Sequence, residues 1–169
     1  MPDQPATLRY VVLRHEGVPE PHFDLMLERE PGGPLMTWRC PSWPVERRTR
    51  IERIGDHRRA YLEFEGRLSG DRGAVSRVGS GTYELAADPE FNRPGQVNWQ
   101  IYFKPAAEHA DLLLRAWTDS AGRPQWDAAP MCAAVRRRPI SLVEMRTIPP
   151  ATAARSNRGT RTGCTARTR

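Results

Sequence analysis

The sequence RHEGVPEPHFD, residues 14–24, sets two histidines and an aspartate around a turn that contains glycine and proline. Before the turn, residues 8–15 (LRYVVLRH) are rich in β-branched and aromatic side chains, which favours a strand. After it, residues 22–28 (HFDLMLE) alternate with the two-residue period of a second strand. Glycine and proline in the connecting segment predict a tight turn. We therefore expect an antiparallel hairpin at the start of the fold.

This hairpin predicts a metal site. The two-residue period places His22 and Asp24 on the same face of the second strand, and the turn can bring His15 alongside them. Neutral imidazole and carboxylate are good ligands for Mn²⁺, Zn²⁺ or Fe²⁺, and two histidines with one carboxylate leave positions open for a substrate. The alternative is a pair of surface histidines that make ordinary hydrogen bonds.

The rest of the chain alternates in short segments joined by turns. Gly79-Ser80-Gly81 predicts a hairpin turn between residues 74–78 and 82–85, and residues 45–54 suit either a short helix or an irregular strand. Further strands are predicted at residues 35–40, 61–68, 97–103, from about 112, and 140–145, with a loop at 88–95. Many short strands and few helices predict a mainly β fold, namely a small antiparallel β-barrel with short flanking helical segments.

The chain changes character near its end. Residues 149–169 contain five arginines and no large apolar side chain, so they cannot bury a core, and we expect a disordered arginine-rich tail. Residues 1–148 then form one β-barrel domain. The five arginines account for most of the net charge of +6, which leaves the folded part nearly neutral.

Composition bounds the partners and the compartment. Only Lys104 among the 26 basic residues is a lysine, and arginine suits phosphate binding, although a GC-rich genome gives the same bias. No apolar run approaches the ~18 residues of a membrane span, and residues 1–5 have no secretory character, so we expect a cytoplasmic protein without membrane contact. Three widely spaced cysteines argue against a disulfide scaffold or a cysteine-based zinc site.

A second polar cluster, DHRRAY, occupies residues 56–61. His57 and Tyr61 could hold a phosphate, and a histidine can protonate a leaving oxygen near neutral pH. The alternative is a histidine in a turn and a tyrosine at the start of a strand, both packed at the surface. Upstream, Arg47, Arg48, Arg50 and Arg53 form a basic patch that either binds phosphate or is a solvated face.

Four blocks in this order, RYVVLRH…PHFDLMLE, LMTWRCPS, GDHRRAYLEFEG and GSGTYE, resemble the 3′-phosphoesterase domain of bacterial DNA ligase D, and they span about residues 9–85. That family belongs to the non-homologous end-joining system, and stand-alone relatives exist. The resemblance implies a small β-barrel in which His15, His22 and Asp24 bind a catalytic Mn²⁺, with other divalent metals possible. It assigns His57 and Tyr61 to the phosphate.

The same resemblance implies a function in DNA repair. The family removes a 3′-terminal ribonucleoside by a phosphodiesterase step and a 3′-phosphate by a phosphomonoesterase step. The implied partners are DNA 3′ ends of primer–templates, together with end-joining ligase or polymerase proteins. We expect the protein itself to be a monomer.

This sequence differs from the family at three positions where a phosphate-binding cation is expected. Met26 stands where the family has an arginine, Ser42 where it has a lysine, and Thr49 where another arginine is expected. Arg48 and Arg50 flank Thr49 and are therefore our candidates for phosphate binding. The alternative function is a catalytically weak or silent module that recognises DNA ends or a repair partner. A related esterase for RNA or small phosphate esters is a further alternative.

Overall fold

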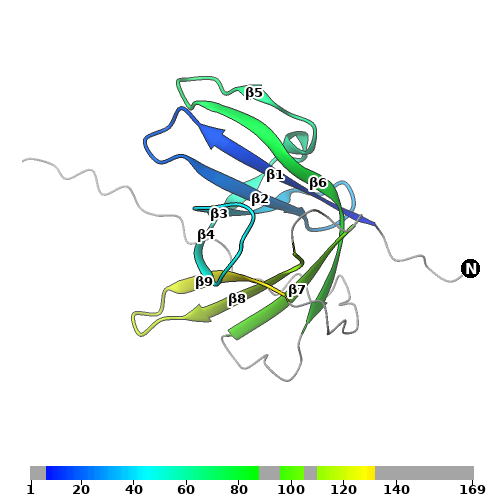
Figure 1. Ribbon diagram of the computed structural model, residues 1–169, viewed down its shortest axis with the longest axis vertical. Helices are drawn as coiled ribbons and strands as arrows, with labels where there is room; N and C mark the ends of the chain where they lie inside the picture. Colours follow the sequence, from blue (N-terminus) through cyan, green and yellow to red (C-terminus); the bar gives the residue numbers. More distant parts are fainter. Residues whose placement is uncertain (1–6, 88–95, 105–109, 132–169) are drawn as a thin grey trace, which may run out of the picture.

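The computed structural model describes residues 7–87, 96–104 and 110–131 of the chain. The sequence predictions for residues 88–95, 140–145 and 149–169 lie outside these described residues. The described part consists almost wholly of strands joined by turns (Figure 1). Its elements are β1 (Leu8–Glu16), β2 (His22–Glu28), β3 (Leu35–Cys40), β4 (Thr49–His57), the 3₁₀ helix η1 (Arg59–Leu62), β5 (Gly66–Arg67), β6 (Ala74–Ala87), β7 (Gln96–Lys104), β8 (Leu112–Thr118) and β9 (Pro124–Pro130).

The strands close into a barrel. They follow one another around it in the order β1-β2-β3-β4-β9-β8-β7-β6, and β6 pairs back onto β1 (Figure 1). Every pairing is antiparallel, and β5 is an appendage that pairs only with β6. Closure satisfies the backbone groups that an open edge strand would expose. The predicted antiparallel β-barrel is confirmed, while the expected flanking helices reduce, among the described residues, to η1.

The barrel interior is filled by the apolar face of each alternating strand. Three tryptophans, Trp38, Trp99 and Trp126, meet at its centre with ring centroids 5.4–6.3 Å apart. Each is 4% exposed or less. These three tryptophans belong to the core, and each contributes a large buried area.

A second apolar cluster covers the outer face of β1, β2 and β3. Its buried members are Val11, Leu13, Met26, Leu35, Leu62 and Val75, and Tyr61 and Leu68 pack against it. Leu62 is the buried residue of η1, so this outer cluster is what holds η1 against the barrel. The polar side chains of the first hairpin point away from the barrel interior. They therefore lie beside this partly apolar cluster and not in open solvent.

The strand predicted at residues 61–68 is wrong. Tyr61 and Glu63 donate backbone hydrogen bonds to carbonyls three residues earlier, which is the pattern of a 3₁₀ turn, and only Gly66–Arg67 form a short strand. The apolar residues at 62, 64 and 68 imitate a two-residue period. Leu62 is indeed buried, but Phe64 is 37% exposed instead of facing inward.

The hairpin predicted around Gly79-Ser80-Gly81 is also wrong, because β6 runs unbroken from Ala74 to Ala87. Gly81 serves close packing instead of a turn. A Cβ on Gly81 would stand 2.5 Å from the carbonyl oxygen of Lys104, so only glycine fits where β6 passes between β1 and β7. A register shift between Val12 and Leu13 marks the same region on β1.

The later strands are confirmed in part. The strand expected at residues 97–103 is β7, with Trp99, Ile101 and Phe103 facing the interior, and the one expected from about 112 is β8. Residues 45–54 contain the start of β4 and no helix. The strand β9, which pairs with β8 and β4, was not predicted, because the prolines at both of its ends disguise it.

Candidate metal centre

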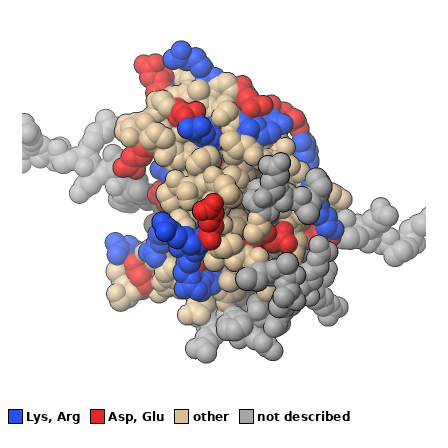
Figure 2. Space-filling view, viewed as in Figure 1, with Lys and Arg blue, Asp and Glu red and all other residues tan. Residues whose placement is uncertain are grey.

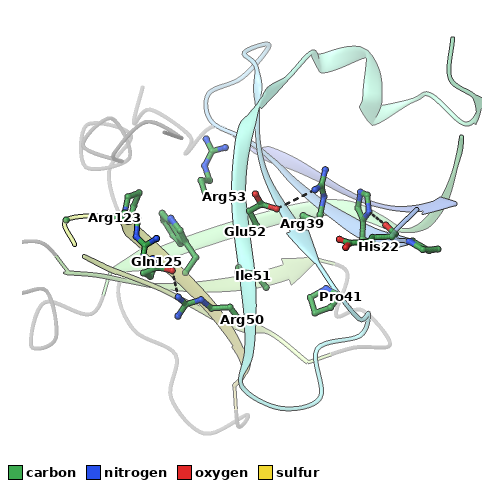
Figure 3. Close-up of a pocket in the computed structure, with 14 residues that line it drawn as sticks. His22, Arg39, Pro41, Arg50, Ile51, Glu52, Arg53, Arg123 and Gln125 are labelled. Atoms are coloured by element: carbon green, nitrogen blue, oxygen red, sulfur yellow. Dashed lines mark hydrogen bonds and ion pairs between the residues drawn. The ribbon is translucent and has the colours of Figure 1, made fainter. Parts of the chain in front are cut away.

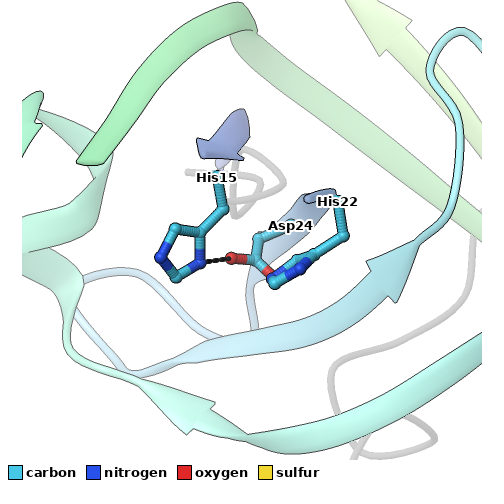
Figure 4. A group of neighbouring side chains, drawn as sticks. All are labelled: His15, His22 and Asp24. Carbon is cyan, nitrogen blue, oxygen red and sulfur yellow. Dashed lines mark ion pairs between the residues drawn. The ribbon is translucent and has the colours of Figure 1, made fainter. Parts of the chain in front are cut away.

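His15, His22 and Asp24 converge on the outer face of the barrel (Figure 4). His15, near the end of β1, pairs directly with His22 at the start of β2, and Asp24 follows two residues later on the same face. One ligand atom from each side chain lies within 4.8 Å of the others. The hairpin thus brings the three residues together as its alternation predicted.

Two glycines shape this end of the hairpin. Gly17 adopts a positive φ of 72°, and Gly73 comes so close to the hairpin that a Cβ would meet the carbonyl oxygen of Glu16 at 2.0 Å. This approach brings the carbonyl oxygen of Arg72 to 2.6 Å from His15 Nε2. The segment before β6 therefore fixes the orientation of the His15 ring.

Backbone carbonyls fix both histidine rings in the orientation that metal ligation needs. A carbonyl oxygen can only accept, so His15 Nε2 donates to Arg72 and His22 Nδ1 donates to the carbonyl of Glu20 at 2.7 Å. In the neutral rings the remaining nitrogens, His15 Nδ1 and His22 Nε2, then carry lone pairs. Ligating histidines in metalloproteins are held in this way by a hydrogen bond from the other ring nitrogen.

The remaining polar atoms face one another at distances too long for a hydrogen bond. His15 Nδ1 lies 3.7 Å from Asp24 Oδ2, and His22 Nε2 lies 3.6 Å from Asp24 Oδ1. Hydrogen bonds to a carboxylate are about 2.7–2.9 Å long, so neither contact is one. His22 Nε2 and Asp24 Oδ1 are buried and have no hydrogen-bond partner. Buried polar groups in this condition are rare and carry an energetic penalty.

A divalent cation would satisfy this arrangement. Atoms that share a Zn²⁺ or similar ion at about 2.0–2.2 Å stand roughly 3–4 Å apart, which matches the two distances to Asp24. The donor set of two imidazoles and one carboxylate suits Mn²⁺, Fe²⁺ and Zn²⁺. The residues present therefore fit a metal ion, and the buried lone pairs are the observation that supports this fit.

The candidate centre opens into a pocket of about 510 Å³, named here the central pocket. Its lining includes the three candidate ligands together with His57 and Tyr61, so the two polar clusters of the sequence meet in one cavity. His57 and Tyr61 contact each other edge to face, with ring centroids 5.2 Å apart. His57 Nδ1 is held 3.0 Å from the carbonyl of Gly55, which leaves Nε2 as its second polar atom.

A buried carboxylate anchors the element that carries Tyr61. Glu28 is 2% exposed and accepts hydrogen bonds from Arg59 Nε of η1 and from the backbone N–H of Gly32, both at 2.9 Å. It also accepts from the backbone N–H of Arg9 at 3.1 Å. Because Glu28 ends β2, this contact ties η1 to the same hairpin that carries the candidate ligands.

Arg48 and Arg50, the phosphate-binding candidates of the sequence analysis, line other cavities. Arg48 lines a pocket over β7, β8 and β9. Arg50 lines a groove of about 670 Å³ that shares His22, Glu20 and Arg39 with the central pocket. Figure 3 shows Arg50 beside Gln125 in this groove, away from His22. Arg50 also stacks over Trp117, with its guanidinium carbon 4.8 Å from the ring centre.

Two arginines that the sequence analysis did not single out line the central pocket. Arg39, on β3, is the register partner of Asp24, and its Nε is buried without a hydrogen-bond partner. Arg72 lies in the turn before β6. The alternation of β3 places Arg39 on the polar face, but only the strand register reveals that it faces Asp24.

Charges of both signs are mixed over the rest of the visible surface. Figure 2 shows basic and acidic side chains interspersed over the face in view instead of a single basic patch. Among the described residues, many arginines are paired with carboxylates, as Arg39 is with Glu52 at 3.4 Å and Arg115 is with Asp127 at 2.7 Å. We therefore expect the basic side chains that could bind phosphate to lie in particular pockets.

No model of a known protein family matches the chain, and a comparison with curated proteins finds no relative. Within the described residues, no helix has the length and apolar character that crossing a membrane requires.

Proposed function

We propose that this protein is a metal-dependent phosphoesterase that processes DNA 3′ ends, with Mn²⁺ as the favoured ion. One observation carries the proposal. His22 Nε2 and Asp24 Oδ1 are buried acceptors without partners, in a pocket that also contains His57 and Tyr61. A cation site beside a histidine, a tyrosine and two arginines suits the binding and hydrolysis of a phosphate ester.

The candidate ligands have separate roles from the groups that contact substrate. His15, His22 and Asp24 would hold the ion, and a bound divalent ion supplies Lewis-acid stabilisation of charge on phosphoryl oxygens. Because His57 Nδ1 donates to the carbonyl of Gly55, Nε2 is the atom that faces the substrate, and the doubly protonated ring would give its Nε2 proton to the leaving oxygen. The hydroxyl of Tyr61 would donate to a phosphoryl oxygen across the same pocket.

Arg39 and Arg72 are the best candidates for the phosphate grip. Both line the central pocket, whereas Arg48 and Arg50 do not. A guanidinium matches phosphate geometry with two parallel hydrogen bonds. Met26 also lines the pocket, but its side chain is 1% exposed and belongs to the outer apolar cluster. We infer that the cation of the resembling family at this position is replaced by Arg39 from the neighbouring strand.

Turnover on defined 3′ ends tests the proposal. Primer–templates that end in a 3′-ribonucleoside and in a 3′-phosphate are incubated with the full chain and Mn²⁺, and products are resolved by electrophoresis or phosphate release. His15→Ala and His22→Ala should each abolish product formation. His109, the fourth histidine of the sequence, provides the matched control, His109→Ala, which should retain activity. Unchanged turnover in both ligand variants would refute the proposal.

A silent DNA-end or repair-partner binding module is the second candidate. It is favoured by the buried Met26 and by Ser42, which stand where the resembling family has an arginine and a lysine. Under this alternative the wild-type chain binds a primer–template end in the presence of Mn²⁺ but releases neither nucleoside nor phosphate. Binding and turnover measured on the same substrate separate the two functions.

A further inference from the structure

A smaller pocket of about 280 Å³ adjoins the central pocket. It is lined by three arginines, Arg58, Arg67 and Arg72, and by the rings of Tyr61 and Phe64. We name it the arginine–aromatic pocket. It lies between η1, β5 and the turn before β6, and it shares Tyr61, Leu68 and Arg72 with the central pocket. The two pockets are therefore neighbours.

The charged side chains that line this pocket are all positive. No aspartate or glutamate lines it, and within the described residues none of its three arginines forms an ion pair with a carboxylate. Arg72 is instead positioned by Ser69, donating from Nε to the carbonyl at 2.7 Å and from Nη2 to Oγ at 2.9 Å. Three guanidinium groups without a carboxylate partner indicate an anionic ligand.

The aromatic side of the pocket suits a flat ring. Phe64 is 37% exposed, and only Val78 joins it as an exposed large apolar residue in the described part of the chain. The Phe64 ring makes an edge contact with Tyr61, with centroids 5.9 Å apart, and the backbone N–H of Phe64 donates to the carbonyl of Ala60 at 3.1 Å. A fixed, exposed ring beside arginines is the usual platform for an unpaired nucleobase.

We propose that the arginine–aromatic pocket is a nucleotide subsite, which binds the nucleotide on the 5′ side of the reacting phosphate. This inference rests on the proposed function and assigns a direction to the strand in that site. A terminal nucleoside on the 3′ side carries no phosphate other than the reacting one, so it gives Arg58 and Arg67 no phosphate to bind. The nucleotide on the 5′ side carries a phosphate of its own for Arg58 and Arg67, and its base stacks on Phe64.

Two substrates with the same reacting group test the subsite. One is an oligonucleotide with a 3′-phosphate, and the other is p-nitrophenyl phosphate, which lacks the strand. Phe64→Ala and Arg67→Ala should each lower kcat/KM on the oligonucleotide by about tenfold, because stacking and phosphate contacts are lost. Neither should change the rate on p-nitrophenyl phosphate. Phe64→Trp should keep the oligonucleotide rate near that of the wild type.

Val78→Ala and Arg47→Ala serve as matched controls, because they remove an exposed apolar residue and an exposed arginine that line none of the pockets described above. Equal loss on both substrates, or no loss in Phe64→Ala and Arg67→Ala, would overturn the subsite.

If the wild-type chain hydrolyses neither substrate, the proposed function fails, and the subsite is judged by binding alone. The fluorescence of an oligonucleotide with 2-aminopurine at its 3′ end should then be quenched by the wild type but not by Phe64→Ala. Equal quenching by both proteins would refute the subsite.

Discussion

His22 Nε2 lies 3.6 Å from Asp24 Oδ1, and both atoms are buried without a hydrogen-bond partner. The other ring nitrogen of His22 already donates to the Glu20 carbonyl, so the neutral ring presents only a lone pair to the carboxylate. Two buried acceptors that face each other are unfavourable unless a cation or a proton lies between them. The separation is too long for a shared proton and suits two ligands of one ion.

A divalent ion should therefore stabilise the fold. A ligand that binds only the native state adds about 2.7 kcal/mol to the free energy of unfolding at 100 times its Kd. Thermal unfolding with increasing Mn²⁺ should show a rising Tm in wild type, reversed by a chelator. His22→Ala should show no rise, whereas His109→Ala should behave as wild type. An equal rise in wild type and His22→Ala would place the ion elsewhere.

Asp24→Asn should separate metal binding from stability. Without metal, the substitution removes a buried negative charge and supplies an amide N–H that can donate toward His22 Nε2. The free energy of unfolding of the metal-free protein should then stay within about 1 kcal/mol of wild type or rise, while the Mn²⁺-dependent rise in Tm is lost. Urea unfolding with and without Mn²⁺ measures both quantities. A large loss of stability in the metal-free variant would show that Asp24 has a structural role instead.

The hairpin could be predicted from sequence because its signals are local. Alternation within residues 22–28 places His22 and Asp24 on one face, and the turn pairs His15 with His22. By contrast, the approach of His57 depends on how β3 and β4 pair, including a register shift between Leu35 and Thr37 that no short pattern encodes. The sequence therefore indicates which residues could form the site, whereas the distances between them follow from the pairing of the strands in the barrel.

The errors have a common physical origin. A two-residue apolar pattern predicted a strand at residues 61–68, but burial of Leu62 against the outer cluster favoured a 3₁₀ turn. Glycine at 79 and 81 predicted a turn, although Gly81 is required by the close passage of β6 past Lys104. In both places a tertiary contact overrode the local preference. Arg39 was not predicted for the same reason, because only its pairing with Asp24 in the strand register places it beside the candidate metal ligands.

Glu28 should be essential for the position of η1. Its buried carboxylate accepts hydrogen bonds from Arg9, Gly32 and Arg59, so Glu28→Ala leaves these donors unpaired. We expect the free energy of unfolding to fall by about 3 kcal/mol in urea denaturation. Glu63→Ala is the matched control, since its ion pair with Arg9 is exposed and should contribute little to stability. Equal effects of the two substitutions would contradict the anchoring role.

Cys40 should be inert toward alkylation in the folded protein. It lies fully buried in the barrel core, and burial, followed by the nearby charge of Asp24, raises the pKa of its thiol to about 12. A raised thiol pKa disfavours the thiolate, which is the reactive form, so almost none exists at pH 8. In a Cys132→Ser, Cys164→Ser background, iodoacetamide should label Cys40 only when urea unfolds the chain, and the labelling rate at increasing urea should follow the unfolded fraction. Raising the pH from 7 to 9 should leave native labelling slow, because this range stays well below the pKa of Cys40. Rapid labelling of the native protein at pH 8 would mean that the barrel opens at Cys40 far more often than its packing allows.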